Sequence, residues 1–196
     1  SLANNTGSNN VALGQSALFS NTTASNNTAV GFQAGYSNTT GTGLTAIGKQ
    51  ALYTNSTGTS NIAIGNASML DNTTGSTNTA IGDTSLPNNT TGASNVAIGY
   101  QSLLSNTTAS GNVAIGDNAL RAYQTGGDNV VIGRNAGYTL NGNGNCTFLG
   151  RGAGFDTTGG NNTFVGYSSG SGVTSGAKNT IVGLFNGNQH SLDIRT

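Results

Sequence analysis

The feature of this sequence that most constrains its fold is a five-residue motif that recurs along the whole chain. The motif is written N-V-A-I-G where it is most regular, and N-I-A-I-G or N-T-A-I-G in near copies. Consecutive copies are 17 residues apart, except for one interval of 16. Short units that repeat at a fixed period are typical of solenoids, in which each unit buries its apolar surface only against the next. The motif ends at eleven glycines, which we name the corner glycines: Gly14, Gly31, Gly48, Gly65, Gly82, Gly99, Gly116, Gly133, Gly150, Gly166 and Gly183.

The repeats leave no room for a separate folded domain. We expect one array over residues 1–183, whose repeat character changes near residues 131–150. Residues 184–196 are expected to form an exit segment that leads to a further region of a longer protein.

Composition excludes several classes of partner. Charged residues make up only 6% of the chain, and such a polar, glycine-rich sequence alone favours disorder. A disordered tract, however, does not keep apolar residues in register over eleven periods. Six basic and six acidic residues leave no net charge, which argues against a nucleic-acid partner. No apolar run reaches the roughly 18 residues of a membrane span, so no membrane insertion is expected.

Two kinds of position alternate before each corner glycine. The residue just before the glycine is always aliphatic, and the residue three before it is always Val, Ile or Thr. We name these two sets the flanking columns. Side chains alternate along a strand, so both flanking columns share one face, and β-branched residues suit a strand. We expect this face to point into the solenoid.

The residue between the flanking columns, two before the glycine, forms the middle column. Alanine is a weak strand former, so a column of it indicates close packing against the opposite face. About three large apolar side chains per repeat give a core that is thin beside an ordering cost of roughly 1–2 kcal/mol per residue, which favours a partner. We therefore predict a homotrimer, with a threefold axis lined by the middle column: Ala12, Ala29, Ala46, Ala63, Ala80, Ala97, Ala114, Val131, Phe148, Phe164 and Ile181.

A corner is predicted at both ends of each strand. Glycine adopts a positive φ without steric cost, whereas Asn tolerates left-handed backbone, and stacked Asn amides can form a ladder. After the glycine, an A-L or S-L pair predicts a second short strand, and N-T-T-G or N-T-T-A predicts a turn. The position four before the glycine holds Leu44 and Cys146 in two repeats. In the other nine it holds Asn, a set that we name the strand Asn column: Asn10, Asn27, Asn61, Asn78, Asn95, Asn112, Asn129, Asn162 and Asn179.

The repeat resembles a known family of fibrous proteins. The pattern N-x-A-I-G, followed after two residues by Ala or Ser, is similar to the YadA-like head repeat of trimeric autotransporter adhesins. The longer unit N-T-A-V-G-F-Q-A-G-Y-S-N-T-T-G-T-G at residues 27–43, and the exit N-T-I-V-G-L-F-N-G-N-Q-H-S-L-D-I-R-T, are more similar to trimeric phage tail-fibre shafts. Such shafts commonly precede an endosialidase-type intramolecular chaperone. The resemblance implies an all-β, parallel β-solenoid or β-roll, left-handed and assembled as a homotrimer, on a virion or cell surface.

The sequence offers little for catalysis. His190 is the single histidine and lies beyond the last repeat with Asp193 nearby, which is typical of a surface residue. Cys146 replaces an Asn of the repeat, which favours a buried thiol over a nucleophile. Asn-x-Thr sequons recur in the turns, for example at Asn21 and Asn38. We expect no catalytic residue, no metal site and no cofactor.

One column is predicted to face solvent, because five charged residues fall in it. Its charged and aromatic members could bind a glycan, although a solvated edge that prevents sideways aggregation is the preferred explanation of the pattern. This corner column is the residue immediately after each corner glycine: Gln15, Phe32, Lys49, Asn66, Asp83, Tyr100, Asp117, Arg134, Arg151, Tyr167 and Leu184.

The function expected from these observations is structural and not enzymatic. The chain would form a fibre or adhesin shaft on a virion or in the extracellular space, with itself as partner and a host-surface glycan or protein as a further one. The alternatives are an ice-binding β-solenoid and a self-assembling extracellular filament or adhesin of a bacterium. A polysaccharide-cleaving spike would need paired carboxylates, and the six aspartates are scattered along the chain.

Overall fold

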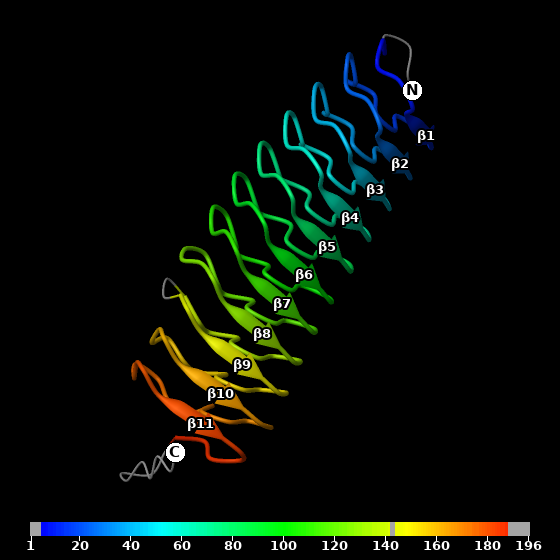
Figure 1. The fold of residues 1–196 in the computed structure, drawn as a ribbon. Coiled ribbons are helices and arrows are strands. Elements are labelled where there is room, and N and C mark those ends of the chain that lie inside the picture. The colour runs from blue at the N-terminus through cyan, green and yellow to red at the C-terminus, as the bar shows by residue number, and fades with distance from the viewer. Residues whose placement is uncertain (1–4, 142–143, 188–196) are drawn as a thin grey trace.

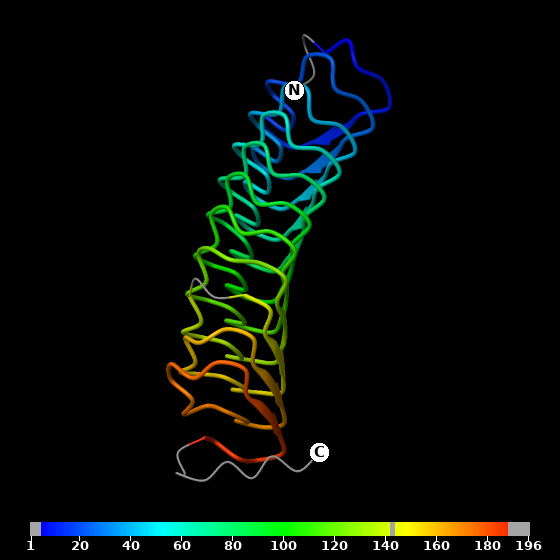
Figure 2. The same cartoon turned by 60° about the vertical axis from the view of Figure 1, so that its left-hand side comes forward.

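The computed structural model describes residues 5–141 and 144–187, and over these it is an all-β solenoid. Eleven parallel strands form one sheet in chain order, with β1 at one end and β11 at the other (Figure 1). The sheet runs along one side of the stack and the turns along the other (Figure 2). We call each turn of about 17 residues a rung. The strands are β1 (Val11–Leu13), β2 (Thr28–Val30), β3 (Thr45–Ile47), β4 (Ile62–Ile64), β5 (Thr79–Ile81), β6 (Val96–Ile98), β7 (Val113–Ile115), β8 (Val130–Ile132), β9 (Thr147–Leu149), β10 (Thr163–Val165) and β11 (Thr180–Val182).

The strands pair without a slip in register. Ala80 lies opposite Ala97, one period further on. Phe148 lies opposite Phe164 across the shortened interval. The deleted residue is therefore taken from the turn, so that every column of the sheet continues through the irregular rung.

The corner glycines have the positive φ angles that the sequence predicts. Their φ angles lie between 113° and 139°, a region that side chains disfavour. Stacking adds a second constraint, because a Cβ atom on Gly99 would lie 2.6 Å from the carbonyl carbon of Gly116. Glycine is thus favoured at every corner by φ, and at every corner except Gly183 it is also required by the closeness of the next rung.

The prediction of a second strand in each rung is wrong. Within the described residues each rung has one strand, and the A-L segment is a turn. The reason is that left-handed residues alternate with others there, as at Gln50 (φ 57°) and Leu52 (φ 51°), and such a backbone is not extended. The segment still bonds to the next rung, because the Leu52 amide donates to the Ser68 carbonyl at 3.0 Å.

The predicted faces of the strand are reversed. The middle column points into the solenoid, and Ala46 to Phe164 are at most 1% exposed within a single chain. The flanking columns point outward, where none of their residues is buried. The prediction that the middle column lines a threefold axis is therefore wrong, because a second copy cannot reach it: Ala12, Ala29, Ala46, Ala63, Ala80, Ala97, Ala114, Val131, Phe148, Phe164 and Ile181.

The narrowness of the core explains this reversal. Six of the alanines share a rung with Leu or Met at the fourth position after the corner glycine, as Ala80 does with Leu86. Where the middle column is Phe, the same position is glycine. A Cβ atom on Gly154 would lie 2.5 Å from Cε2 of Phe148, so the ring occupies the space that Leu fills elsewhere. In these rungs a small residue in the middle column is thus paired with a large one after the corner glycine, and a large residue in the middle column with glycine.

The strand Asn column lies inside the solenoid. The left-handed residues are those just before it, such as Ser60 (φ 56°), and not the Asn residues themselves. Asn61 accepts a hydrogen bond at Oδ1 from the Asn78 amide at 2.9 Å. The Nδ2 group of Asn78 donates to the Gly92 carbonyl at 2.8 Å. The side chains therefore replace backbone partners at the end of the strand, in addition to forming amide contacts between rungs.

A second amide ladder, which the sequence analysis did not predict, runs through the turns. Asn72 donates from Nδ2 to Asn55 Oδ1 at 2.8 Å and to the Gly75 carbonyl at 2.9 Å. The ladder ends at Asn106, whose Oδ1 is buried without a partner, because the next rung carries Tyr123 instead. Its members are Asn5, Asn21, Asn38, Asn55, Asn72, Asn89 and Asn106.

Candidate functional site

The flanking columns form a long, largely apolar surface on the outside of the sheet. Residues in the middle of the array, such as Ile47 and Ile132, are 37% and 39% exposed, although both are aliphatic. The column just before the glycine is aliphatic in every rung, whereas the column three before it holds Thr in six rungs. With neighbouring strands about 4.8 Å apart, eleven rungs extend this surface over about 50 Å.

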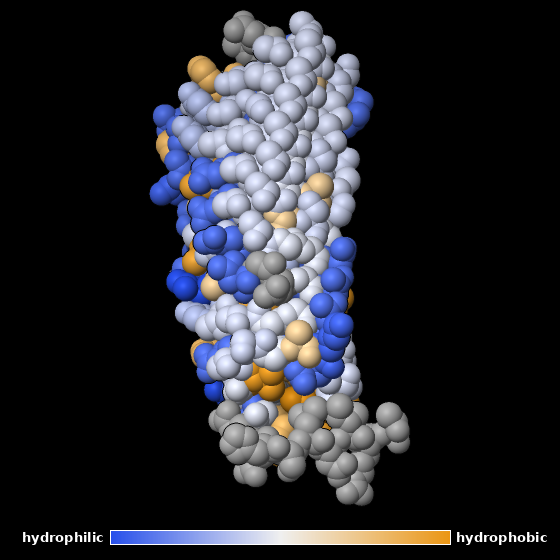
Figure 3. All heavy atoms as spheres, turned by 90° about the vertical axis from the view of Figure 1, so that its left-hand side faces the viewer, coloured by the Kyte–Doolittle hydropathy of each residue, from blue (hydrophilic) through white to orange (hydrophobic). Residues whose placement is uncertain are grey.

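The opposite side of the molecule has a different character. The turns present mainly Thr, Ser, Gly and Asn, and few apolar groups reach the surface there (Figure 3). The hydroxyls of one turn column bond within the array, as Thr73 Oγ1 donates to the Thr90 carbonyl at 2.9 Å. The sequon residues Asn21 and Asn38 are buried, so glycosylation at these turns is excluded in the folded chain.

The corner column is exposed in every rung, as was predicted. It changes in character near the C-terminal end of the array, where Arg134, Arg151 and Tyr167 follow one another in consecutive rungs. The Arg151 guanidinium lies 5.5 Å from the centre of the Tyr167 ring, within the range of a cation–π contact. Its Nη1 also lies 3.5 Å from the Tyr167 hydroxyl oxygen.

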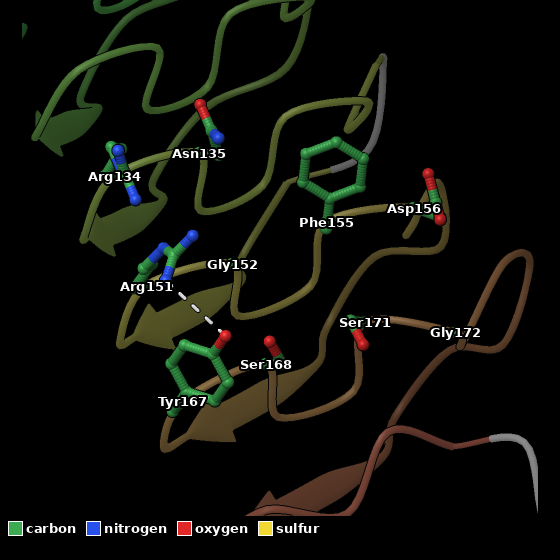
Figure 4. A pocket seen from close by; sticks show the side chains of 10 residues that line it. All are labelled: Arg134, Asn135, Arg151, Gly152, Phe155, Asp156, Tyr167, Ser168, Ser171 and Gly172. Atoms are coloured by element: carbon green, nitrogen blue, oxygen red, sulfur yellow. Dashed lines mark hydrogen bonds between the residues drawn. The ribbon is translucent and has the colours of Figure 1, made fainter.

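These three residues form one wall of a hollow of about 350 Å³ (Figure 4). Phe155 and Asp156 stand on the other side, and small residues of the intervening turns lie between the two walls. The turns supply few side-chain atoms there, which keeps the space between the walls open. The hollow is lined by Arg134, Asn135, Arg151, Gly152, Phe155, Asp156, Tyr167, Ser168, Ser171 and Gly172.

The described residues give no arrangement for acid–base or nucleophilic chemistry. Residues 5–141 and 144–187 contain no group of three His, Cys, Asp or Glu that could hold a metal ion. Cys146 is 1% exposed, and burial raises the pKa of its thiol, which disfavours the reactive thiolate. Its backbone amide donates to Asn129 Oδ1 at 2.9 Å, as the backbone amides of the strand Asn column do. Cys146 has no side-chain amide, however, so it cannot continue the ladder of amide side chains. His190 and Asp193 lie outside the described residues.

Comparison with known proteins does not assign a family. No protein-family model, no curated protein and no solved structure matches the chain significantly. Among the described residues, no helix has the length and hydrophobicity needed to cross a bilayer.

Sequence reasoning identified part of this surface. The corner column was predicted to be exposed, and Arg134, Arg151 and Tyr167 belong to it. Phe155, Asp156 and Ser171 were not expected to face these residues, since they come from the segment predicted as strand and turn. The signal that could have located the hollow is the occurrence of two arginines at the same position of consecutive rungs.

Proposed function

We propose that this chain is a non-enzymatic structural shaft of a fibre or adhesin, which holds a receptor-binding region away from a virion or cell surface. The proposal is supported by the unbroken stack of rungs, in which each strand pairs only with its neighbours along the chain. It is also supported by the resemblance of the repeat to tail-fibre shafts and adhesin heads. A stack about 50 Å long with continuous strand pairing is a suitable spacer.

The observation that carries the proposal is the exposed aliphatic surface of the flanking columns. Soluble monomers rarely leave a long contiguous apolar surface in contact with water, and such surfaces mark interfaces. A partner that carries the same repeat would match this surface rung by rung. We therefore assign self-association to the flanking columns in place of the middle column. Three copies is the number that the resemblance implies, with the outer faces of three sheets around one axis.

Native mass spectrometry tests this assignment. The parent should have the mass of three chains. Ile98→Asp places a carboxylate in a flanking column and should release single chains, because burying an unpaired charge in an apolar interface is costly. The matched control is Tyr100→Asp, which puts the same charge in the corner column, where Tyr100 is 49% exposed. A monomeric parent, or an Ile98→Asp protein that keeps the parent's mass, would contradict the proposal.

Ice binding remains a second candidate, on one observation. Six of the eleven residues in one outward-facing flanking column are Thr, and three of them stand in consecutive rungs from β9 to β11. The two functions are distinguishable, because a trimer would cover this face. A monomeric parent that shows thermal hysteresis, abolished by Thr79→Lys, would replace the shaft proposal with ice binding.

A further inference from the structure

Two arginines stand one above the other at the edge of the hollow. Arg134 and Arg151 occupy the corner column in consecutive rungs, which places their backbones about 4.8 Å apart. The nearest carboxylate of the same column, on Asp117, lies one rung away from Arg134 and faces the Tyr100 amide, which donates to it at 3.3 Å. Two adjacent like charges repel each other, and an anion between them would relieve this repulsion.

The hollow also offers aromatic surface. Phe155 stacks on Tyr138 with ring centres 5.0 Å apart and planes 10° from parallel, which fixes the orientation of its ring. Tyr167 is 54% exposed beside the Arg151 guanidinium. Aromatic rings bind the apolar C–H faces of sugars, whereas a small inorganic anion gains nothing from them.

The remaining lining groups are hydrogen-bonding partners. Asn135, Ser168 and Ser171 supply an amide and two hydroxyls, and Asp156 supplies an acceptor on the wall opposite the arginines (Figure 4). A ligand that satisfies all of them carries carboxylates toward the arginines and hydroxyls toward Asp156. It must also reach over about 10 Å, because the lining residues come from three consecutive rungs about 4.8 Å apart.

We propose that this hollow binds an acidic oligosaccharide of the uronate type. Its carboxylates lie against Arg134 and Arg151, one sugar face packs on the exposed Tyr167 ring, and its hydroxyls bond to the serines and Asp156. The guanidinium group suits this role, because its planar donors bind a carboxylate through two parallel hydrogen bonds. The arginine wall begins two residues after the flanking columns, whereas the rest of the lining comes from the turns.

Calorimetric titration of the whole chain with tetragalacturonate tests the site. The parent should bind with a Kd below about 1 mM. Arg151→Gln should raise the Kd about tenfold, since hydrogen bonds to charged groups are the stronger ones. The matched control is Lys49→Gln, which removes the same charge from the same column six rungs earlier and should leave the Kd unchanged.

Further variants and ligands in the same titration distinguish a saccharide site from a site for a simple anion. Tyr167→Ser should raise the Kd about fivefold, whereas Tyr100→Ser, in the same column, should not change it. A neutral glucose tetrasaccharide should bind at least about tenfold more weakly than tetragalacturonate. The proposal is overturned by a parent that does not bind tetragalacturonate, or by an unchanged Kd in Arg151→Gln. Sulfate that binds as tightly, or an unaffected Tyr167→Ser protein, would reduce the hollow to an anion site and overturn the saccharide assignment.

Discussion

At the scale of the residue, one backbone angle decides whether the chain can turn after each strand. Gly99 has φ 126°, and a Cβ atom there would lie 2.6 Å from a backbone atom of the next rung. Gly99→Ala should therefore lower the free energy of unfolding by about 2–5 kcal/mol, from backbone strain and overpacking together. Urea unfolding followed by circular dichroism measures this change.

Gly43 provides the control for this prediction. It is also left-handed (φ 69°), but a Cβ atom there would meet nothing closer than 3.6 Å. The same position holds Asn26 and Ser60 in neighbouring rungs, with φ 61° and 56°. Gly43→Ala should cost only about 1 kcal/mol. Equal losses in the two variants would show that stacking against the next rung does not constrain the corner.

The buried Tyr123 should make stability depend on pH in the alkaline range. Burial is the main cause that raises the pKa of its hydroxyl to about 12, against an ordinary value of 10.0. Between these values the unfolded chain has lost the proton that the folded chain keeps, so the free energy of unfolding falls as pH rises from about 10 to 12. Tyr123→Phe should remove this part of the slope, as measured by urea unfolding at a series of pH values.

The Tyr123→Phe variant should still fold. The hydroxyl accepts from Asn129 Nδ2 at 2.7 Å, but that group also donates to Asn112 Oδ1 at 2.8 Å. Cys146 contributes a slope of the same sign in both proteins, because burial raises its pKa as well. The comparison therefore isolates Tyr123, and identical slopes in the two proteins would refute the assignment.

At the scale of the element, the sequence predicted where each strand lies but not which side it buries. The interval between corner glycines set the number of rungs, and the apolar residues before them located the strands. Both strand faces are apolar, however, so alternation alone could not distinguish inside from outside. The deciding fact is that the solenoid is narrow: an inward Ile opposite Leu86 would overfill it, and Ala80 does not.

The exchange of bulk across the core predicts a strong coupling between two positions. Phe148→Ala should cost about 3–5 kcal/mol by opening a cavity. Gly154→Leu should also destabilise, because its side chain would collide with the Phe148 ring. The double variant recreates the Ala and Leu pair of Ala80 and Leu86, at a backbone position where Leu86 itself has φ 50°.

A double-mutant cycle measures this coupling. The loss in the double variant should be smaller than the sum of the two single losses by at least about 2 kcal/mol. Ala63→Gly with Gly154→Leu, which lie several rungs apart, should instead be additive. Additive losses for Phe148→Ala and Gly154→Leu would mean that the two positions do not share one space.

At the scale of the whole molecule, stability should be distributed along the stack. Each strand pairs with the strands before and after it, and the two amide ladders likewise connect neighbouring rungs. The corner column was predictable as surface because its position repeats with the period. The hollow was not, because its opposite wall comes from a segment whose conformation was misassigned. Repeat arrays of this kind have a stability that is roughly a sum of rung and neighbour terms.

A deletion of one full period tests this view of the molecule. Removing residues 66–82 joins Gly65 to Asp83, so that every column continues and only one interior rung is lost. The shortened chain should unfold in one transition with a slightly lower free energy of unfolding, and tetragalacturonate binding should be unchanged.

Removing residues 83–90 instead keeps every strand but joins Gly82 to Thr91, which deletes the wall opposite β5. That half-period deletion should divide the array and give two separate melting transitions by calorimetry, because the rungs on either side no longer stack. If both deletions abolished folding equally, the molecule would behave as one indivisible core and not as a stack of rungs.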